Sequence, residues 1–228
     1  MIDGLNFEAV TSLSFGGFPA PTFSILSPTQ IQALVPAGAT SGRISLGNES
    51  GVVLSPTEFT VELPPISHFS FAPTDDAHVN SGSTAKNYGS VAELRARDSS
   101  SDYRFFAKFD VARLTAPVQR ATLRLFVNDG SPVGGALFGV SNDLLGTSTP
   151  WRETSLTWNN APLLAGAVVA SLAAVSAGTW VEFDVTPLVT GNGSVSFGVS
   201  SSSSNSVYYH SKQGANRPEL VVDTAPAP

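Results

Sequence analysis

The stretch YRFFAKFDV, from Tyr103 to Val111, alternates strictly between two kinds of side chain and decides the fold class. Successive side chains of a β-strand point to opposite faces. One face of this stretch is apolar and consists of Phe105, Ala107, Phe109 and Val111. The other face holds Arg104, Phe106, Lys108 and Asp110. The pattern therefore predicts a strand that buries one face in a core and presents two cations on the other.

The preceding stretch, Val91 to Arg97, alternates in the same way, and the polar run Asp98 to Asp102 joins it to YRFFAKFDV. Two alternating runs with a polar connection are typical of a β-hairpin. In such a hairpin one face would hold a basic stripe of four cations, namely Arg95, Arg97, Arg104 and Lys108. Two interpretations stay open: the stripe is a solvated outer face with scattered ion pairs, or it is a binding surface for a polyanion.

The composition favours an all-β protein and excludes several classes of function. The chain has 228 residues, of which 42% are hydrophobic and 13% charged, and Ser, Thr, Gly and Pro interrupt every apolar run. No run approaches the roughly 20 apolar residues that a membrane-spanning helix needs, and the start MIDGLNFEAV lacks the features of a signal peptide. The absence of cysteine excludes disulfides and thiol catalysis. A net charge of -6 argues against nucleic-acid binding, so we expect neither nucleic acid nor membrane as a partner.

The first part of the chain predicts a small antiparallel sandwich. Pro and Gly separate short strand-like segments, which are VTSLSF, TFSIL, QIQALV, GRISLG and EFTVEL. The G-x-N-F start, the S-x-T-x-I-x-A-x-V-P centre and the late Gly of this part resemble an immunoglobulin-like IPT/TIG domain. The strand that precedes the Gly-x-Asn-Phe turn in that family is absent from this sequence. A sandwich without it would leave an open edge near Val10 to Phe15, whose backbone groups need partners.

Two consecutive prolines mark the domain boundary. The run Leu63-Pro64-Pro65-Ile66 favours an extended connection that cannot belong to a central strand. We therefore expect an IPT/TIG-like domain at residues 1–63, a linker at 64–67 and a larger domain at 68–228. A short, proline-rich linker is stiff, so we expect it to hold the two domains at a defined angle.

The second part of the chain predicts a jelly-roll β-sandwich. Its dozen short segments are HFSFA, AHVN, VAELRAR, YRFFAKFDV, QRATLRLFV, ALFGVS, SLTW, AVVASL, TWVEFDV, SVSFGVS, SVYYHSK and PELVVD. The motifs DDAHVNSG, NYG, RFFAKFDV, ATLRLFV, W-x-E-x-x-L-T-W-N-N-A-P, WVEFDVTPLV and YYHSKQGANRPELVV follow one another over residues 74–222. In this order they resemble a DNRLRE-type domain, which is carbohydrate-binding module family ninety-six. The resemblance implies a non-catalytic polysaccharide-binding module.

Aromatic residues offer two further candidate surfaces. We interpret Trp151, Glu153, Trp158 and Asn160 as anchors of a loop wedged between strands rather than as a sugar platform. Trp180 is predicted to lie in the core, on the strand face opposite to Val181 and Phe183. Tyr208, His210 and Lys212 share one strand face. This row is either an ordinary polar edge or an acceptor of a carboxylated or sulfated sugar.

Metal binding and catalysis are weighed from the acidic residues and the histidines. A structural Ca²⁺ ion would need several oxygen ligands, and the candidates are Asp75, Asp76, Asn87 and Asp184. They lack the spacing of a calcium loop, but jelly-roll binding modules commonly contain calcium. The three histidines lie far apart, and the sequence contains no nucleophile elbow and no phosphate loop. We therefore expect no enzyme activity.

Two hypotheses about function follow. In the first, the chain is an extracellular or cell-surface module, secreted and of bacterial type, that binds an acidic polysaccharide such as alginate. The basic stripe would pair with uronate carboxylates, the Tyr208-His210-Lys212 row would border the site, and the IPT/TIG-like domain would act as a spacer. In the alternative, the chain is a structural subunit of an extracellular fibre or matrix. Successive copies would then assemble head to tail by covering the open IPT/TIG-like edge.

Overall fold

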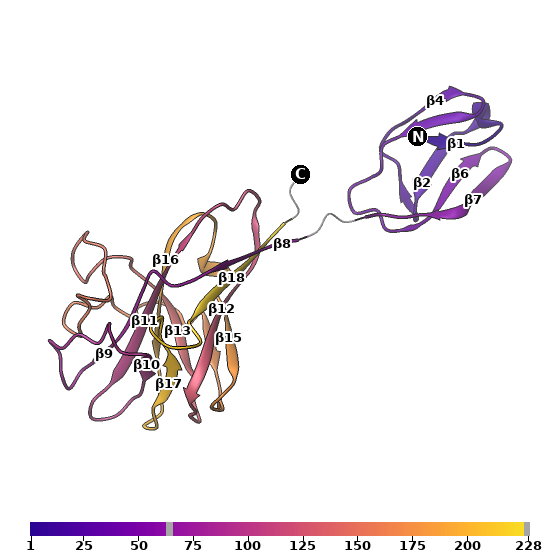
Figure 1. Ribbon diagram of the computed structural model, residues 1–228. Helices are drawn as coiled ribbons and strands as arrows, with labels where there is room; N and C mark the ends of the chain where they lie inside the picture. The colour runs from indigo at the N-terminus through magenta and orange to yellow at the C-terminus, as the bar shows by residue number, and fades with distance from the viewer. Residues whose placement is uncertain (63–65, 226–228) are drawn as a thin grey trace. The chain divides into compact units, whose positions relative to one another are not determined.

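The computed structural model describes residues 1–62 and 66–225 and confirms the all-β fold class (Figure 1). Within these ranges two 3₁₀ turns accompany the strands, η1 (Phe7–Ala9) and η2 (Thr186–Leu188). No helix of the described residues is long and apolar enough to cross a membrane. The chain divides into two compact units, Met1–Pro64 and Pro65–Pro228. Residues 64 and 65 of the predicted linker 64–67 lie outside the described residues, so the stiffness of this linker stays a prediction.

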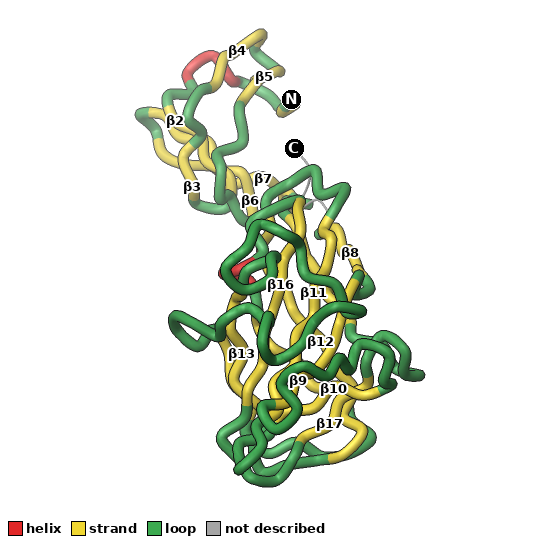
Figure 2. The backbone as a smooth tube through the Cα atoms, turned by 90° about the vertical axis from the view of Figure 1, so that its left-hand side faces the viewer, coloured by secondary structure: helices red, strands yellow, loops and turns green. Residues whose placement is uncertain are grey.

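Two antiparallel sheets form the first unit, with strand orders β1-β5-β4 and β3-β2-β6-β7 (Figure 2). The strands are β1 (Ile2–Asp3), β2 (Ser12–Phe15), β3 (Phe18–Pro19), β4 (Phe23–Ser27), β5 (Gln30–Ala33), β6 (Gly42–Asn48) and β7 (Gly51–Phe59). Gly16 and Gly17 join β2 to β3 with φ angles of 57° and 90°, because a two-residue hairpin turn favours positive φ. A small core of Phe7, Leu13, Phe15 and Ile31 links the two sheets.

The structure corrects two expectations about the first unit. A short strand, β1, does precede the turn and pairs with β5, with Ile2 opposite Ile31. The open edge expected near Val10 to Phe15 is also wrong, because β2 lies between β3 and β6. The long outer strand of this sheet is instead β7, which pairs with β6 along one side.

The second unit is built from a six-stranded and a five-stranded antiparallel sheet. The six-stranded sheet has the order β10-β17-β12-β18-β8, with β15 also paired to β12. Its strands are β8 (Ser67–Phe71), β10 (Glu93–Ala96), β12 (Val118–Asp129), β15 (Trp180–Asp184), β17 (Val207–His210) and β18 (Glu219–Thr224). The five-stranded sheet has the order β14-β13-β16-β11-β9. Its strands are β9 (Asp75–Asn80), β11 (Tyr103–Val111), β13 (Gly135–Val140), β14 (Ala170–Leu172) and β16 (Gly193–Ser200).

The stretch YRFFAKFDV forms β11, and its apolar face lies in the core as predicted. Phe105, Ala107, Phe109 and Val111 are at most 3% exposed and belong to one hydrophobic cluster. Residues of the other sheet complete this cluster, among them Leu94 of β10, Leu123 of β12 and Phe183 of β15. The alternation of one strand thus correctly predicts which side chains enter the core of the sandwich.

The predicted hairpin does not form. β10 pairs with β17 in the six-stranded sheet, whereas β11 pairs with β9 and β16 in the five-stranded sheet. Between these two stretches, all of which are described, a single bridge joins Arg97 to Tyr103. The run from Asp98 to Asp102 therefore crosses from one sheet to the other, because Leu94 and Phe105 both enter the same core. Consequently the four cations of the basic stripe cannot share one strand face.

β17 and β18 are two parts of one interrupted neighbour of β12. Tyr209 of β17 lies opposite Val127 of β12, and Glu219 of β18 lies opposite Arg124. The intervening segment 211–218 does not pair with β12. β10 and β17 lie at the end of the second unit opposite to β8 (Figures 1 and 2).

Candidate functional site

Lys108 is an internal anchor rather than a surface cation. The outer face of β11 is covered by a loop, in which Trp151 is 0% exposed and packs edge-on against Phe106. Lys108 is only 6% exposed, and its Nζ lies 4.3 Å from the centre of the Trp151 ring. The ammonium donates hydrogen bonds to the carbonyl oxygens of Asn142, at 3.1 Å, and of Trp151. Burial lowers the pKa of Lys108, and its place in the predicted basic stripe is corrected.

The tryptophan-rich motif is structural, as interpreted from its sequence. Trp151 and Leu156 belong to a hydrophobic cluster with Phe106, and Trp158 packs against it. The Oδ1 of Asn160 accepts hydrogen bonds from the backbone N–H of Thr157 at 2.7 Å and from its hydroxyl at 3.0 Å. Trp151 and Leu156 thus hold the loop on β11, and Asn160 stabilises a turn within the loop.

Arg104 and Lys212 also contact this loop. The guanidinium carbon of Arg104 lies 4.6 Å from the ring centre of Trp158. The Nζ of Lys212 donates to the carbonyl oxygen of Thr74 at 2.7 Å and lies 3.0 Å from the carboxylate of Glu153. Both cations therefore lie on the covered side of the five-stranded sheet, apart from the other predicted binding residues.

The four predicted calcium ligands do not gather into one site. Asp75 accepts a hydrogen bond from the N–H of Glu153 at 3.0 Å, and Asn87 donates to the carbonyl oxygen of Glu153 at 2.6 Å. Asp184 lies on β15 in the other sheet, where it accepts hydrogen bonds from Thr186. Across residues 1–62 and 66–225, no group of three His, Cys, Asp or Glu side chains is placed to hold a metal. A common site of all four fails because Asp184 belongs to the other sheet from Asp75 and Asp76.

Asp76 is the most strongly perturbed carboxyl group of this region. It is 1% exposed, and burial raises its pKa to about 7. The N–H of Lys212 donates to its Oδ2 at 2.7 Å, whereas its Oδ1 has no hydrogen-bond partner among the described residues. Asp76 thus contributes to the junction between β9 and the segment after β17.

Three residues of the predicted binding set do come together, around Arg95 of β10. The guanidinium carbon of Arg95 lies 3.8 Å from the ring centre of Tyr103 and 5.0 Å from that of Tyr208. The guanidinium carbon of Arg97 lies 5.1 Å from the ring centre of Tyr103. The Nε of Arg95 donates to the hydroxyl of Ser206 at 2.9 Å. We call these four residues, Arg95, Arg97, Tyr103 and Tyr208, the Arg95 cluster; all four are half-buried.

The cations of the Arg95 cluster are not neutralised by the protein. In the part of the chain that the structure describes, no carboxylate oxygen lies within 4.0 Å of Arg95 or Arg97. Arg124, by contrast, lies 2.7 Å from Glu219. The ring centre of His78 lies 5.7 Å from that of Tyr103. Burial lowers the pKa of His78 to about 4, so this imidazole is neutral near pH 7. Two arginines beside aromatic rings can therefore pair with an anion from outside.

His210 and Trp180 lie on the outer face of the six-stranded sheet. His210 is opposite Glu93 of β10, and its ring centre is 5.1 Å from that of Phe126. Trp180 is 39% exposed, which corrects its predicted place in the core. The predicted alternation along β15 is nevertheless confirmed, since Phe183 is 1% exposed and faces inward. The pattern identifies two faces, but a tryptophan at a strand start does not indicate which of them is covered.

Three aromatic residues also contribute to these surfaces, although the sequence did not assign them to a site: Tyr103, Phe126 and Trp180. Tyr103 begins β11, so its position in the alternating stretch indicates a core side chain. It meets Arg95 because β10 and β11 belong to different sheets at this end of the unit. The sequence contains no signal for this contact, which depends on how the two sheets pack.

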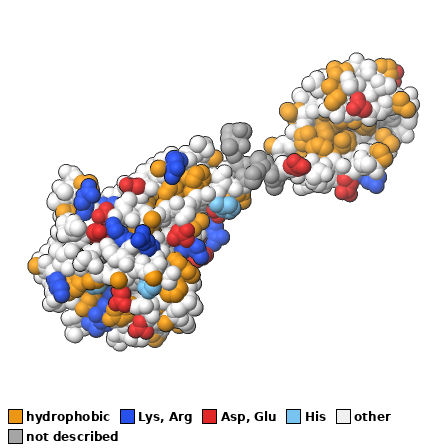
Figure 3. Space-filling view, viewed as in Figure 1, with side chains coloured by type: hydrophobic (Ala, Val, Ile, Leu, Met, Phe, Trp, Pro, Cys, Tyr) orange, Lys and Arg blue, Asp and Glu red, His pale blue; other side chains and the backbone are white. Residues whose placement is uncertain are grey.

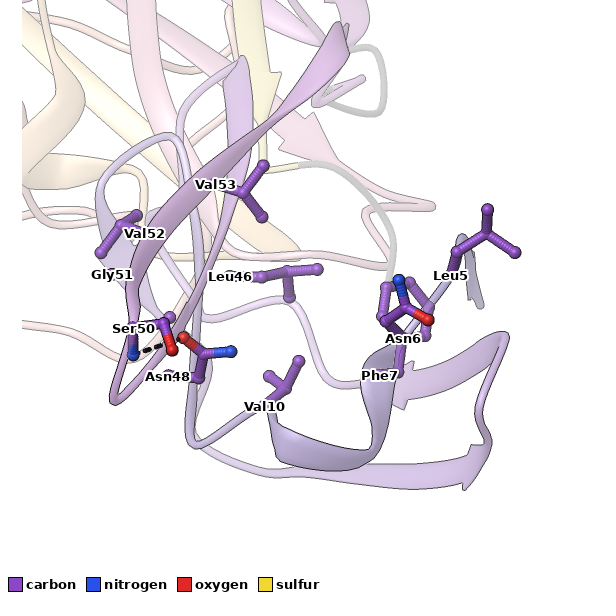
Figure 4. Close-up of a pocket in the computed structure, with 11 residues that line it drawn as sticks. Leu5, Asn6, Phe7, Val10, Leu46, Asn48, Ser50, Gly51, Val52 and Val53 are labelled. Carbon is purple, nitrogen blue, oxygen red and sulfur yellow. Dashed lines mark hydrogen bonds between the residues drawn. The ribbon is translucent and has the colours of Figure 1, made fainter.

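The two units differ in charge and in their cavities. Of the 12 Lys and Arg residues, all except Arg43 lie in the second unit, and Figure 3 shows Lys and Arg side chains scattered among acidic ones on the visible face of that unit. The first unit contains a cavity of about 330 Å³ beside β6 and β7 (Figure 4). Its lining is mixed: Val10, Leu46 and Val52 supply apolar groups, and Asn48 and Ser50 supply polar ones.

Comparison with known proteins gives one family match and several distant structural matches. The model of carbohydrate-binding module family 96 matches residues 67–224. A structure solved with a xylogluco-oligosaccharide is 14% identical, with 97% of this chain and 52% of that chain covered and a TM-score of 0.24. SGBP-B from a xyloglucan utilization locus in Bacteroides uniformis is also 14% identical, with 97% and 66% covered and a TM-score of 0.22. The chain thus spans about half the length of the first of these, and at such TM-scores neither carries an argument about binding. No curated protein matches the chain.

Proposed function

The chain belongs to carbohydrate-binding module family 96 over residues 67–224, and from this premise we propose that its second unit binds an acidic polysaccharide such as alginate. It is a non-catalytic module that acts outside the cell or at the cell surface. The first unit, two small sheets around one core, is an IPT/TIG-like spacer in this proposal. The choice of an acidic polymer depends on the charges of the second unit.

The observation that supports an acidic ligand is that Arg95 contacts two tyrosine rings and has no carboxylate partner among the described residues. Its guanidinium lies between the rings of Tyr103 and Tyr208. Its Nε is bound to Ser206, so its orientation is held. A planar guanidinium can donate two parallel hydrogen bonds to a uronate carboxylate. A neighbouring tyrosine ring can cover the apolar face of the same sugar residue.

The structure reduces the number of cations that such a site can use. Arg95 and Arg97 form its charged centre, and Tyr208 and His210 border it. Lys108 is buried and Lys212 is engaged with Glu153. A partly exposed ion pair contributes little by itself and is weakened by salt. We therefore expect affinity to depend on several uronate residues bound at once and to fall as ionic strength rises.

Arg95→Gln tests this proposal. The substitution keeps a polar side chain but removes the charge, so we expect retention on an alginate affinity gel at low salt to fall by about two- to fivefold, the value of one partly exposed ion pair. Arg120→Gln is the matched control, because Arg120 is an exposed arginine of the same sheet whose guanidinium lies 3.9 Å from Glu182. Equal retention of the two variants and the unaltered protein would remove the Arg95 cluster as the binding site.

A second candidate function, self-assembly into a fibre or matrix, now depends on β7 instead of β2. Val52, Val53 and Leu54 of this outer strand are 73%, 62% and 55% exposed, and an unpaired strand edge can accept a strand from another copy. We expect sedimentation velocity to show mass that increases with concentration for the unaltered protein and a monomer for Val53→Lys, because lysine opposes edge pairing. A monomer at every concentration for both proteins would exclude assembly through β7.

A further inference from the structure

A shallow cleft on the outer face of the six-stranded sheet lies between Trp180 and the segment 215–219. Its volume is about 370 Å³, at the lower end of the range for small-ligand sites. Trp180, Phe71 and Pro218 supply apolar lining, and Ser70, Asn216 and Glu219 supply polar groups. The cleft therefore combines the two kinds of surface that a sugar ring presents.

The ring of Trp180 is held in place by its neighbours. Phe126 lies across the strand pair from it, with ring centres 5.5 Å apart and an interplanar angle of 74°. The guanidinium carbon of Arg124 lies 5.0 Å from the Trp180 ring centre. On the other side of Phe126, the Nδ1 of His210 accepts a hydrogen bond from the N–H of Asn216 at 3.0 Å. These contacts fix both the aromatic wall and the segment that faces it, so little ordering is needed when a ligand enters.

The polar side of the cleft is fixed as well. Arg124 donates to Glu182 at 3.2 Å and to Glu219 at 2.7 Å, and the hydroxyl of Ser70 donates to Glu219 at 2.5 Å. Together with Arg217, which also lines the cleft, the two arginines balance the two glutamates. The local charge is therefore near zero, in contrast to the unpaired cations of the Arg95 cluster. A carboxylate has spare lone pairs that can accept hydrogen bonds from the hydroxyl groups of a sugar, and a site without net charge does not attract a uronate.

We infer that this cleft is a second glycan subsite, which takes an uncharged pyranose residue. The apolar face of the sugar stacks on Trp180, and its hydroxyl groups exchange hydrogen bonds with Glu219, Ser70 and Asn216. The subsite differs from the Arg95 cluster in position and in the charge of its ligand. It does not depend on the proposal that the module binds an acidic polymer.

The test compares Trp180→Ala and Arg95→Gln on two kinds of affinity gel. The first kind contains alginate, and the second contains a soluble neutral polysaccharide, either glucomannan or a mixed-linkage β-glucan. We expect the unaltered protein to be retarded by at least one neutral gel, and Trp180→Ala to reduce that retardation at least about tenfold without abolishing retention on alginate. Arg95→Gln should keep the retardation on the neutral gel.

A conservative variant and a fluorescence measurement distinguish a loss of binding from a loss of folding. Trp180→Phe should recover part of the neutral-glycan binding, and thermal unfolding of all variants is measured beside it. Oligosaccharides of the retained polymer should change the tryptophan fluorescence of the unaltered protein but not that of Trp180→Ala, since Trp151 is buried and Trp158 packs on the loop that covers the other sheet. Absence of retardation of the unaltered protein on both neutral gels would overturn the inference. Equal retardation of Trp180→Ala and the unaltered protein on the neutral gel would also overturn the inference. Absence of alginate retention of the unaltered protein, with its retention on a neutral gel intact, would contradict only the acidic-polysaccharide proposal.

Discussion

Replacement of Lys108 by alanine is expected to lower the free energy of unfolding by about 2–4 kcal/mol, since it leaves buried carbonyl groups without a donor. The carbonyl oxygens of Asn142 and Trp151 both accept hydrogen bonds from this ammonium. The substitution also removes the cation from the face of the Trp151 ring. Because these contacts join the covering loop to β11, the loop should detach first. Denaturant unfolding gives the total loss, and hydrogen exchange at residues 142–161 would locate it.

One further substitution separates the contribution of the Lys108 ammonium from that of its carbon stem, and a second serves as a control. Lys108→Met keeps most of the apolar volume but cannot donate, so it should be nearly as destabilising as Lys108→Ala. Arg104→Ala is the matched control on the same strand face, because Arg104 is only half-buried and contacts the loop through Trp158. Its cost should not exceed about 1 kcal/mol. If Lys108→Ala costs no more than Arg104→Ala, then Lys108 is not the anchor of the loop.

Replacement of Phe109 by alanine is expected to destabilise the second unit by about 3–5 kcal/mol, the usual cost of truncating a large buried aromatic ring. Phe109 is 0% exposed, and its ring centre lies 5.9 Å from that of Phe197 on the neighbouring strand β16. Both sheets contribute to the cluster around it, so the cavity cannot close without moving one sheet toward the other. Equilibrium unfolding in urea, followed by tryptophan fluorescence, measures the effect.

The neighbouring residue is a matched control for Phe109. Asp110 follows it on the same strand, is exposed and accepts a hydrogen bond from the Ser194 hydroxyl at 2.5 Å. Asp110→Ala should change the free energy of unfolding by about 0.5 kcal/mol or less. A loss below about 1 kcal/mol for Phe109→Ala would mean that the core does not depend on this face of β11.

Local patterns predicted the fold class and the inward faces of several strands. The alternation in YRFFAKFDV identifies Phe105 and Phe109 as core residues, and that in TWVEFDV separates Phe183 from Trp180. The interpretation of Trp151 and Trp158 as large apolar anchors of a loop agrees with their packing in the cluster around Phe106. These inferences succeed because the period of a strand is a local property, set by the backbone of the residues concerned.

Local patterns could not determine which strands pair. Val91 to Arg97 and YRFFAKFDV look like the two arms of a hairpin, yet β10 and β11 join different sheets. Either arrangement satisfies the alternation of both stretches equally well. Arg95 and Tyr208 lie opposite one another because β10 pairs with β17, a strand more than a hundred residues further along the chain.

By itself, the sequence determined an all-β protein with a family 96 module and the alternating faces of its strands, because these depend on neighbouring residues. Only the tertiary structure decided what covers each face. A distant loop buries Lys108, whereas the outer face around Trp180 stays open. It also decided that Arg95 meets Tyr103 across two sheets and remains without a carboxylate partner among the described residues. Exposure and charge pairing depend on segments far apart in the chain, and no local pattern encodes which of those segments will meet.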